Sequence, residues 1–273
     1  MSKKPLTRDE QFLAKAAGDD VPMPKPLTRV QEFLERIVER LSGSVTEETL
    51  DNAIAPLNAS IAQLNRKTIQ FRHGKGTFTA TATGTNVVWQ YGGQKAQGSN
   101  CTFDVKSDNG LITLECDTIE NLTIQNDDKN KMDLSNLGGK ITSSLRLYNC
   151  SNITGDLSDL GGKITSSLSL YNCSNITGDL SNLGGKITST LNLYNCTNIT
   201  GVYSGTKYPK TVSVSKTSIT SADMDANLIN FAASGVKSGT FTATGMKRTA
   251  ASDDAVATLV ANGWTVSGLT KEG

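Results

Sequence analysis

A 23-residue repeat constrains the fold of this chain more than any other feature of its sequence. The segment SLRLYNCSNITGDLS at residues 144–158 recurs as SLSLYNCSNITGDLS at 167–181 and as TLNLYNCTNITGVYS at 190–204. Self-similarity at a fixed period of this length is typical of a solenoid, whose units stack because one unit alone cannot bury its apolar side chains. The sequence therefore predicts a stack of coils in which equivalent residues lie above one another.

Each copy of the repeat carries two leucines, a cysteine and an isoleucine at the same places. The aligned sets are Leu145, Leu168 and Leu191; Leu147, Leu170 and Leu193; Cys150, Cys173 and Cys196; and Ile153, Ile176 and Ile199. The pattern L-x-L-x-x-C resembles the leucine-rich repeat, in its variant with cysteine, over residues 119–203. The resemblance implies a short strand with inward leucines and a cysteine that turns the chain beneath it. A weaker copy precedes these three and has Asp127 at the cysteine position, which we interpret as a degenerate terminal coil.

These patterns predict an α+β fold, with short N-terminal helices and a coiled-coil stalk followed by a β-rich, leucine-rich-repeat-like solenoid with a helical C-terminal cap. The expected domains are duplicated docking helices at 1–44, a coiled-coil oligomerisation stalk at 45–72, a β-rich joint at 73–118, the solenoid at 119–220 and a helix–strand cap at 221–273. The joint follows from the alternation in GTFTATATGTNVVWQYGG. In the cap, we expect a helix from near Ser252 and a strand whose Trp264 covers the open end of the stack.

The N-terminal region is itself duplicated. PLTRDEQFLAKAAG begins at Pro5 and PLTRVQEFLERIVE begins at Pro26, and each unit has the spacing of a helix-capping box. Two short helices bury little surface and need a neighbour, so we interpret them as docking elements for a larger assembly; a pair of ordinary surface helices is the alternative. The candidate docking residues are Pro5, Leu6, Thr7, Arg8, Phe12, Leu13, Pro26, Leu27, Thr28, Arg29, Phe33 and Leu34.

A coiled-coil seam is predicted in the next segment; a lone amphipathic helix packed on its own domain is the alternative. Apolar residues recur there at alternating intervals of four and three, the period that keeps one face of a helix apolar in a coiled coil. The candidate oligomerisation residues are Leu50, Ile54, Leu57, Ile61 and Leu64. The order of isoleucine and leucine favours a dimer, and Pro56 within the seam predicts a kink.

The two PLTR segments resemble the N-terminal region of head-fibre and related appendage proteins of tailed bacteriophages. The match covers about the first 40 residues. It implies a structural protein of the virion, made in the host cytoplasm and attached through its N-terminus to the capsid or to another virion protein, with the C-terminal region projecting outward. It also implies a homotrimer, which we favour over the dimer that the seam indicates.

The strands of the repeat present a second set of side chains opposite to the leucines. Because side chains alternate along a strand, Arg146, Tyr148, Tyr171 and Tyr194 are expected to face outward. Three tyrosines a strand apart form a strip suited to sugar rings or to a protein loop on the host surface. In the alternative interpretation, they stack on one another and stiffen the coils.

Composition excludes several other classes of protein. The formal charge of +1 predicts neither a nucleic-acid nor a membrane partner, and we expect no metal, cofactor or catalytic residue. His73 is the single histidine, expected to be exposed, and the five cysteines lack a metal-binding or disulfide spacing. Hydrolysis of a glycan by a pair of carboxylates stays an open alternative. A bacterial surface adhesin and an intracellular scaffold that binds a protein partner are the alternatives to a virion protein.

Overall fold

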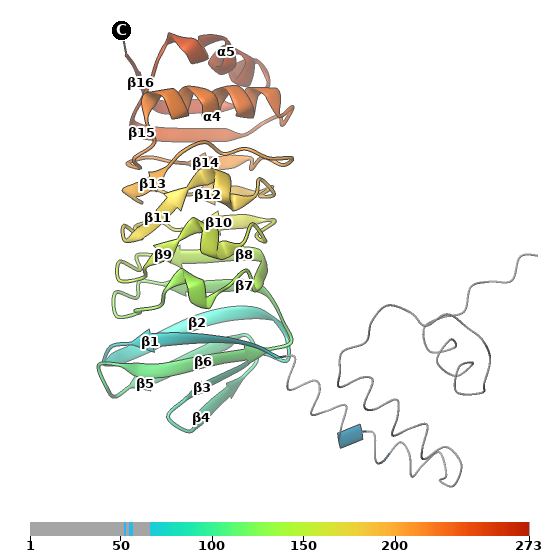
Figure 1. Ribbon diagram of the computed structural model, residues 1–273, viewed down its shortest axis with the longest axis vertical. Helices are drawn as coiled ribbons and strands as arrows, with labels where there is room; N and C mark the ends of the chain where they lie inside the picture. The colour runs from blue at the N-terminus through green and yellow to red at the C-terminus, as the bar shows by residue number, and fades with distance from the viewer. Residues whose placement is uncertain (1–51, 53–54, 57–65, 273) are drawn as a thin grey trace, which may run out of the picture. The chain divides into compact units, whose positions relative to one another are not determined.

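The computed structural model describes residues 52, 55–56 and 66–272 of the 273-residue chain. The chain divides into two compact units, Met1–Leu64 and Asn65–Gly273. The second unit, called the head below, contains every strand of the described residues and is a column of stacked layers (Figure 1).

A nine-stranded mixed sheet runs along the head. The strands lie in the order β16-β15-β14-β12-β10-β8-β7-β2-β5. Their bounds are Gly76–Thr85 (β2), Asn100–Val105 (β5), Thr118–Gln125 (β7), Ile141–Tyr148 (β8), Ser167–Ser169 (β10), Thr190–Asn192 (β12), Thr211–Ser213 (β14), Thr240–Arg248 (β15) and Thr265–Lys271 (β16). Neighbours from β7 to β16 are parallel, whereas β2 pairs antiparallel with both β5 and β7.

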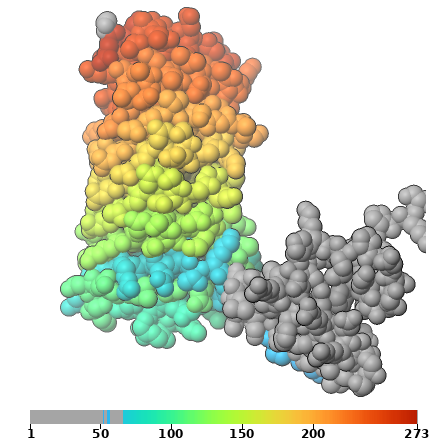
Figure 2. All heavy atoms as spheres, viewed as in Figure 1, coloured from blue at the N-terminus to red at the C-terminus, as the bar shows by residue number. Residues whose placement is uncertain are grey.

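The central coils stack in the register of the sequence repeat. Leu168 pairs with Leu145 of the preceding coil and with Leu191 of the following coil. All three side chains are buried, as are the aligned cysteines and isoleucines. Each row of the repeat therefore becomes a continuous apolar column, and the coils lie in chain order along the head (Figure 2).

The opposite side of each coil carries a second, smaller sheet and a turn of 3₁₀ helix. The sheet consists of β9 (Gly155–Asp156), β11 (Ile176–Asp179) and β13 (Asn198–Thr200), and the 3₁₀ turns are η1 (Leu134–Asn136), η2 (Leu157–Leu160) and η3 (Leu180–Leu183). An aspartate caps each turn, because its carboxylate accepts a hydrogen bond from the amide two residues later. The distances are 3.0 Å at Asp133, 2.9 Å at Asp156 and 2.8 Å at Asp179.

The N-terminal end of the head is closed by a β-sandwich. A four-stranded antiparallel sheet of β1 (Lys67–His73), β6 (Gly110–Cys116), β3 (Val88–Tyr91) and β4 (Gln94–Gln97) lies at this end. Phe71, Phe78 and Trp89 form its aromatic core, with ring centroids 5.7 to 6.1 Å apart. The three rings are fully buried, so they supply much of the apolar area that holds β2 against this sheet.

A buried His–Asp pair joins this end to the first coil. His73 Nε2 lies 2.9 Å from Asp127 Oδ1, and His73 Nδ1 lies 2.5 Å from the carbonyl oxygen of Gly74. The sequence predicted an exposed histidine; this was wrong, because β1 directs His73 into the interior, where its exposed fraction is 0%. Asp127 replaces the cysteine of the other coils because a histidine from the sandwich pairs with it here.

The C-terminal end is closed by α4 (Ser221–Ala233), α5 (Asp253–Ala261) and a short 3₁₀ turn, η4 (Ala250–Ser252). Thr220 caps α4, and its hydroxyl accepts a hydrogen bond from the amide of Asp223 at 3.1 Å. Trp264 is buried edge-to-face against Phe231, and its indole N–H donates to the carbonyl of Val236 at 2.8 Å. Trp264 thus packs beneath the helices with its polar atom paired.

The predicted α+β class was wrong. The head is β-rich, with mixed and parallel sheets, and α4 and α5 are its two α-helices. The predicted docking helices at 1–44 and most of the predicted stalk lie outside the described residues; within the stalk, residues 52 and 55–56 are helical. The stalk was also placed too far along the chain, because residues 67–73 form a strand in which Ile69, Phe71 and His73 are buried at every second position.

The apolar columns give a first prediction. Leu168→Ala should lower the free energy of unfolding by about 2–5 kcal/mol, because the side chain is fully buried between two identical neighbours that cannot fill the space. Urea unfolding followed by circular dichroism measures the change. Leu111→Ala is the control, since Leu111 is 36% exposed and should cost much less. Equal losses from the two variants would contradict the role assigned to the column.

Candidate ligand-binding face

The nine-stranded sheet presents a polar surface on the side opposite to the leucine columns. This surface, called the polar face below, consists of rows of side chains that the strand register aligns. The central row contains Thr123, Arg146, Ser169, Asn192, Ser213 and Thr242, and the next row contains Asn121, Ser144, Ser167, Thr190, Thr211 and Thr240. Hydroxyl and amide groups therefore repeat at the strand spacing of about 4.8 Å, but Ser144, Ser167 and Ser169 are buried, so β10 contributes no accessible polar group from these two rows.

A column of tyrosines borders the polar face at the carboxyl ends of β8, β10 and β12. The rings of Tyr171 and Tyr194 are stacked, with centroids 4.9 Å apart and planes 13° apart. Tyr148 is tilted by 39° against Tyr171, with centroids 6.3 Å apart. All three are half-buried, so the column offers ring edges and hydroxyl groups to a ligand while the stacked faces contact each other.

Lys216 extends the column by one coil. Its ammonium nitrogen lies 5.2 Å from the centroid of the Tyr194 ring, within the range of a cation–π contact. The sequence analysis did not predict this contact, because Lys216 lies in a segment that departs from the 23-residue spacing. The residue adds a positive charge to one end of the aromatic column.

An asparagine follows each tyrosine and turns the chain. Asn149, Asn172 and Asn195 have φ values of 53°, 58° and 58°, in the left-handed region that asparagine tolerates better than most residues. The side-chain amide of Asn172 donates to Asn149 Oδ1 at 2.8 Å, and Asn149 donates in turn to Asn126 Oδ1 at 2.6 Å. The ladder fixes the corner of each coil and with it the position of the adjacent tyrosine. In the sequence, this ladder is indicated by the asparagine that directly follows each repeat tyrosine.

Two members of the central row differ in their exposure. Arg146, predicted to face outward, lies on the polar face of β8 and is half-buried. Ser169, which occupies the same position one coil later, is only 1% exposed, and its hydroxyl has no hydrogen-bond partner among the described residues. The register places the larger side chains of Arg146 and Asn192 on either side of Ser169, so we infer that they cover it.

The cysteines of the head are free and buried. Burial raises the pKa of Cys101 and of Cys196 to about 12 and that of Cys116 to about 11. Hydrogen bonding with Cys173 and burial together raise the pKa of Cys150. Since the thiolate is the reactive form, these cysteines serve packing, and the Cys196 thiol donates to the carbonyl of Leu170 at 2.8 Å.

His73 and Asp127 are in contact in the interior of the head. Both ring nitrogens of His73 face oxygen atoms, Nε2 that of the Asp127 carboxyl group and Nδ1 that of the Gly74 carbonyl. Burial raises the pKa of Asp127, and the neighbouring histidine opposes that shift.

The residues that the structure describes contain no group of three or more histidine, cysteine, aspartate or glutamate side chains able to hold a metal ion. No helix among them has the length and apolar character needed to cross a membrane.

The predicted docking and oligomerisation residues cannot be placed. The twelve docking positions from Pro5 to Leu34 and the five seam positions from Leu50 to Leu64 all lie outside the described residues. Of the predicted site residues, the structure therefore places the four of the polar face. It brings the three tyrosines together and positions Arg146 in the adjacent row of β8.

Comparisons with protein-family models, with curated proteins and with solved structures found no match to this chain.

The asparagine ladder gives a second prediction. Asn172→Gly should cost about 0.5–1.5 kcal/mol of stability, because it removes one side-chain hydrogen bond but accepts the left-handed backbone. Asn172→Ala should cost about 1–2 kcal/mol more, because alanine disfavours that conformation. Urea unfolding of the two variants measures the difference. If alanine proved as stable as glycine here, the backbone argument would be wrong.

Proposed function

We propose that this chain is a structural protein of a bacteriophage particle, a head or tail fibre whose N-terminal region binds the virion and whose head projects outward. In this proposal, residues 1–44 dock on a capsid or other virion protein, and the polar face contacts a glycan or protein on the host surface. The N-terminal resemblance supports the attachment.

The tyrosine column is the observation that carries the binding part of the proposal. Its ring edges and hydroxyl groups lie beside half-buried threonine and asparagine side chains, a combination that can hydrogen-bond sugar hydroxyls. Parallel strands hold these groups in register, so little ordering is needed when a ligand binds.

The closed ends of the head support its use as a projecting domain. The sandwich covers one end and α4, α5 and Trp264 cover the other, so the apolar columns are not open to further coils. An uncapped stack would associate with other chains through its exposed edge. Covered apolar ends suit a head that projects into its surroundings, although β16, the last strand of the sheet, keeps one unpaired edge.

The location of the chain gives a third prediction. Electron microscopy of purified particles, with an antibody against the head, should show projecting label. Phe12→Asp with Phe33→Asp should remove the chain from the particles, because a buried docking face does not accept two carboxylates. Particles that lack label would contradict the proposal and favour a bacterial surface adhesin or an intracellular scaffold. Light scattering of the full chain measures the copy number, for which the resemblance implies three.

The tyrosine column gives a fourth prediction. Tyr171→Ala with Tyr194→Ala should abolish attachment of the head to host cells or isolated envelope glycan, since it removes the stacked pair. Tyr171→Phe with Tyr194→Phe is the matched variant: the rings remain and two hydroxyls are lost, so each lost hydrogen bond should weaken binding by about 0.5–1.5 kcal/mol.

Both double variants are expected to remain folded, and circular dichroism checks this. If the alanine variant attached as well as the unchanged chain, the tyrosines would only stiffen the coils. Incorporation into particles should be unaffected in either variant, which separates attachment to the host from attachment to the virion.

A further inference from the structure

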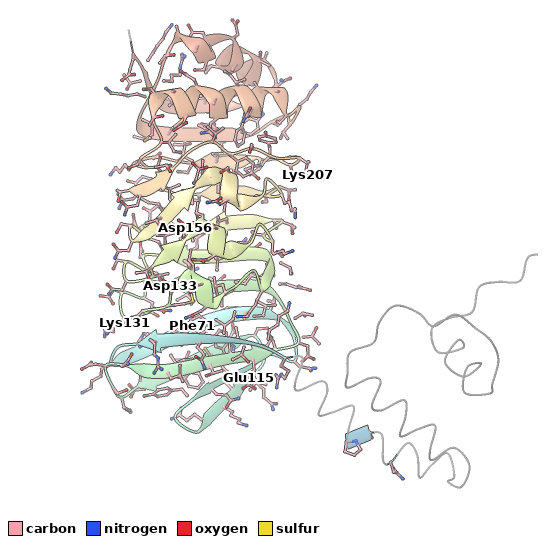
Figure 3. All side chains as sticks on the ribbon, viewed as in Figure 1. Phe71, Glu115, Lys131, Asp133, Asp156 and Lys207 are labelled. Carbon is pink, nitrogen blue, oxygen red and sulfur yellow. The ribbon has the colours of Figure 1, made fainter. Side chains whose placement is uncertain are left out.

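A row of lysines occupies one corner of the coils, across the polar face from the tyrosines. Lys140, Lys163, Lys186 and Lys207 each follow a Gly-x pair and precede the strand of the next coil. This set is called the lysine row below. Its last three members are exposed, and Lys140 is half-buried. Figure 3 shows Lys207 at the edge of the column, apart from Asp133 and Asp156.

Glycines bring successive corners of the coils into direct contact. A Cβ atom on Gly162 would lie 3.3 Å from the Cα of Gly184, and one on Gly185 would lie 2.2 Å from the Cα of Gly205. The Lys207 amide donates across this contact to the carbonyl of Gly185 at 2.9 Å. The corner therefore consists of close-packed backbone from which the lysines project, one per coil, about 4.8 Å apart.

The positive charges of the row are not neutralised within the head. In the part of the chain that the structure describes, Lys163, Lys186 and Lys207 form no ion pair, and the Lys140 ammonium group donates to the backbone carbonyl of Asn136, at 2.8 Å. Like charges at this spacing repel one another. A row of this kind gains stability when a partner supplies negative charge.

The lysine is retained where the copies of the repeat differ. The central row of the polar face changes from arginine to serine to asparagine at positions 146, 169 and 192. The lysine is present in all three GGK segments and again in GTK at 205–207, which lies 21 rather than 23 residues after Lys186. Duplication alone does not account for Lys207, because its segment no longer follows the repeat.

A pocket lies at the C-terminal end of the lysine row. It has a volume of about 280 Å³, and its lining includes Lys207, Lys210, Thr188, Thr206 and Ser234 but no carboxylate. Two lysines and the hydroxyl of Thr206 fit an acidic group attached to a sugar, whereas the hydroxyls of Thr188 and Ser234 donate to the backbone carbonyls of Thr165 and Phe231. Along the row, Thr142, Thr165 and Thr188 lie two residues after each lysine, and their hydroxyls donate to carbonyls of neighbouring coils at 2.8 to 3.1 Å.

We propose that the lysine row and its pocket bind a linear acidic glycan of the host envelope, a polymer with carboxylate or phosphate groups at regular intervals. This inference extends the proposed function. It rests on that function for one point, that the glycan belongs to the host envelope. A single line of charges one strand apart matches one extended chain. Duplex DNA carries one charge per about 1.7 Å on two strands and requires a broader basic surface, whereas the formal charge of this chain is +1.

The test is a titration of the full chain with a fluorescently labelled polygalacturonate oligomer, followed by anisotropy. Lys163→Glu with Lys186→Glu should weaken binding by about tenfold. The control is Lys75→Glu with Lys95→Glu, which makes the same change in net charge at exposed lysines outside the row and should leave the affinity within about twofold. Binding should weaken as salt is added. Poly(glycerol phosphate) in a parallel titration distinguishes a phosphate source from a carboxylate source.

Three results would overturn the inference: equal losses in the two double variants, equal affinity for neutral dextran, or tighter binding of duplex DNA than of either acidic polymer. Circular dichroism confirms that both variants are folded before they are compared. The titration uses the isolated chain, whereas particle microscopy tests its location, so either proposal can fail while the other stands.

Discussion

In-register contact between equivalent residues of successive coils is the constraint on which the rest of the head depends. Parallel pairing places each leucine against the leucine of the next coil, so the interior positions of the three full copies are apolar, and the buried Asp127 of the first coil needs a partner in His73. The same rule acts on the surface, where it produces an asparagine ladder, a tyrosine column and a lysine row from single residues of the repeat. A single substitution in the ancestral unit thus appears as a line of identical groups, which suits a long ligand better than a compact one.

The apolar interior of the column is covered by different elements at its two ends. At the N-terminal end, antiparallel strands and an aromatic cluster cover the first coil, and His73 reaches 54 positions along the chain to a carboxylate that replaces a cysteine. At the C-terminal end, two helices and Trp264 cover the last strands, with Asp225 accepting hydrogen bonds from Thr249 and Ser252. Both ends combine apolar cover with a buried carboxylate that fixes the position of the cover.

The sequence indicated the spacing of the coils and the position of the tyrosines, because both depend on a period that can be read directly from the repeat. It did not indicate the partner of His73, since Asp127 resembled an error in the repeat and the pairing depends on tertiary contact. The predicted α+β class did not account for how much of the head is strand; the strand alternation of Ile69, Phe71 and His73 was overlooked because these residues were assigned to the end of the stalk and the start of the joint. Burial of Ser169 depends on the size of its neighbours in other coils, which alternation within one strand does not reveal.

Sameness of the inner coils has a consequence for the length of the head. The coil that contains Leu168 meets the coil before it and the coil after it through the same side chains. Deletion or insertion of one 23-residue unit therefore leaves both capped ends intact. Recombination between the near-identical copies would change the reach of the molecule in steps of about 4.8 Å, and would add or remove one tyrosine and one lysine at each step. The length of the head and its number of surface tyrosines and lysines therefore change together.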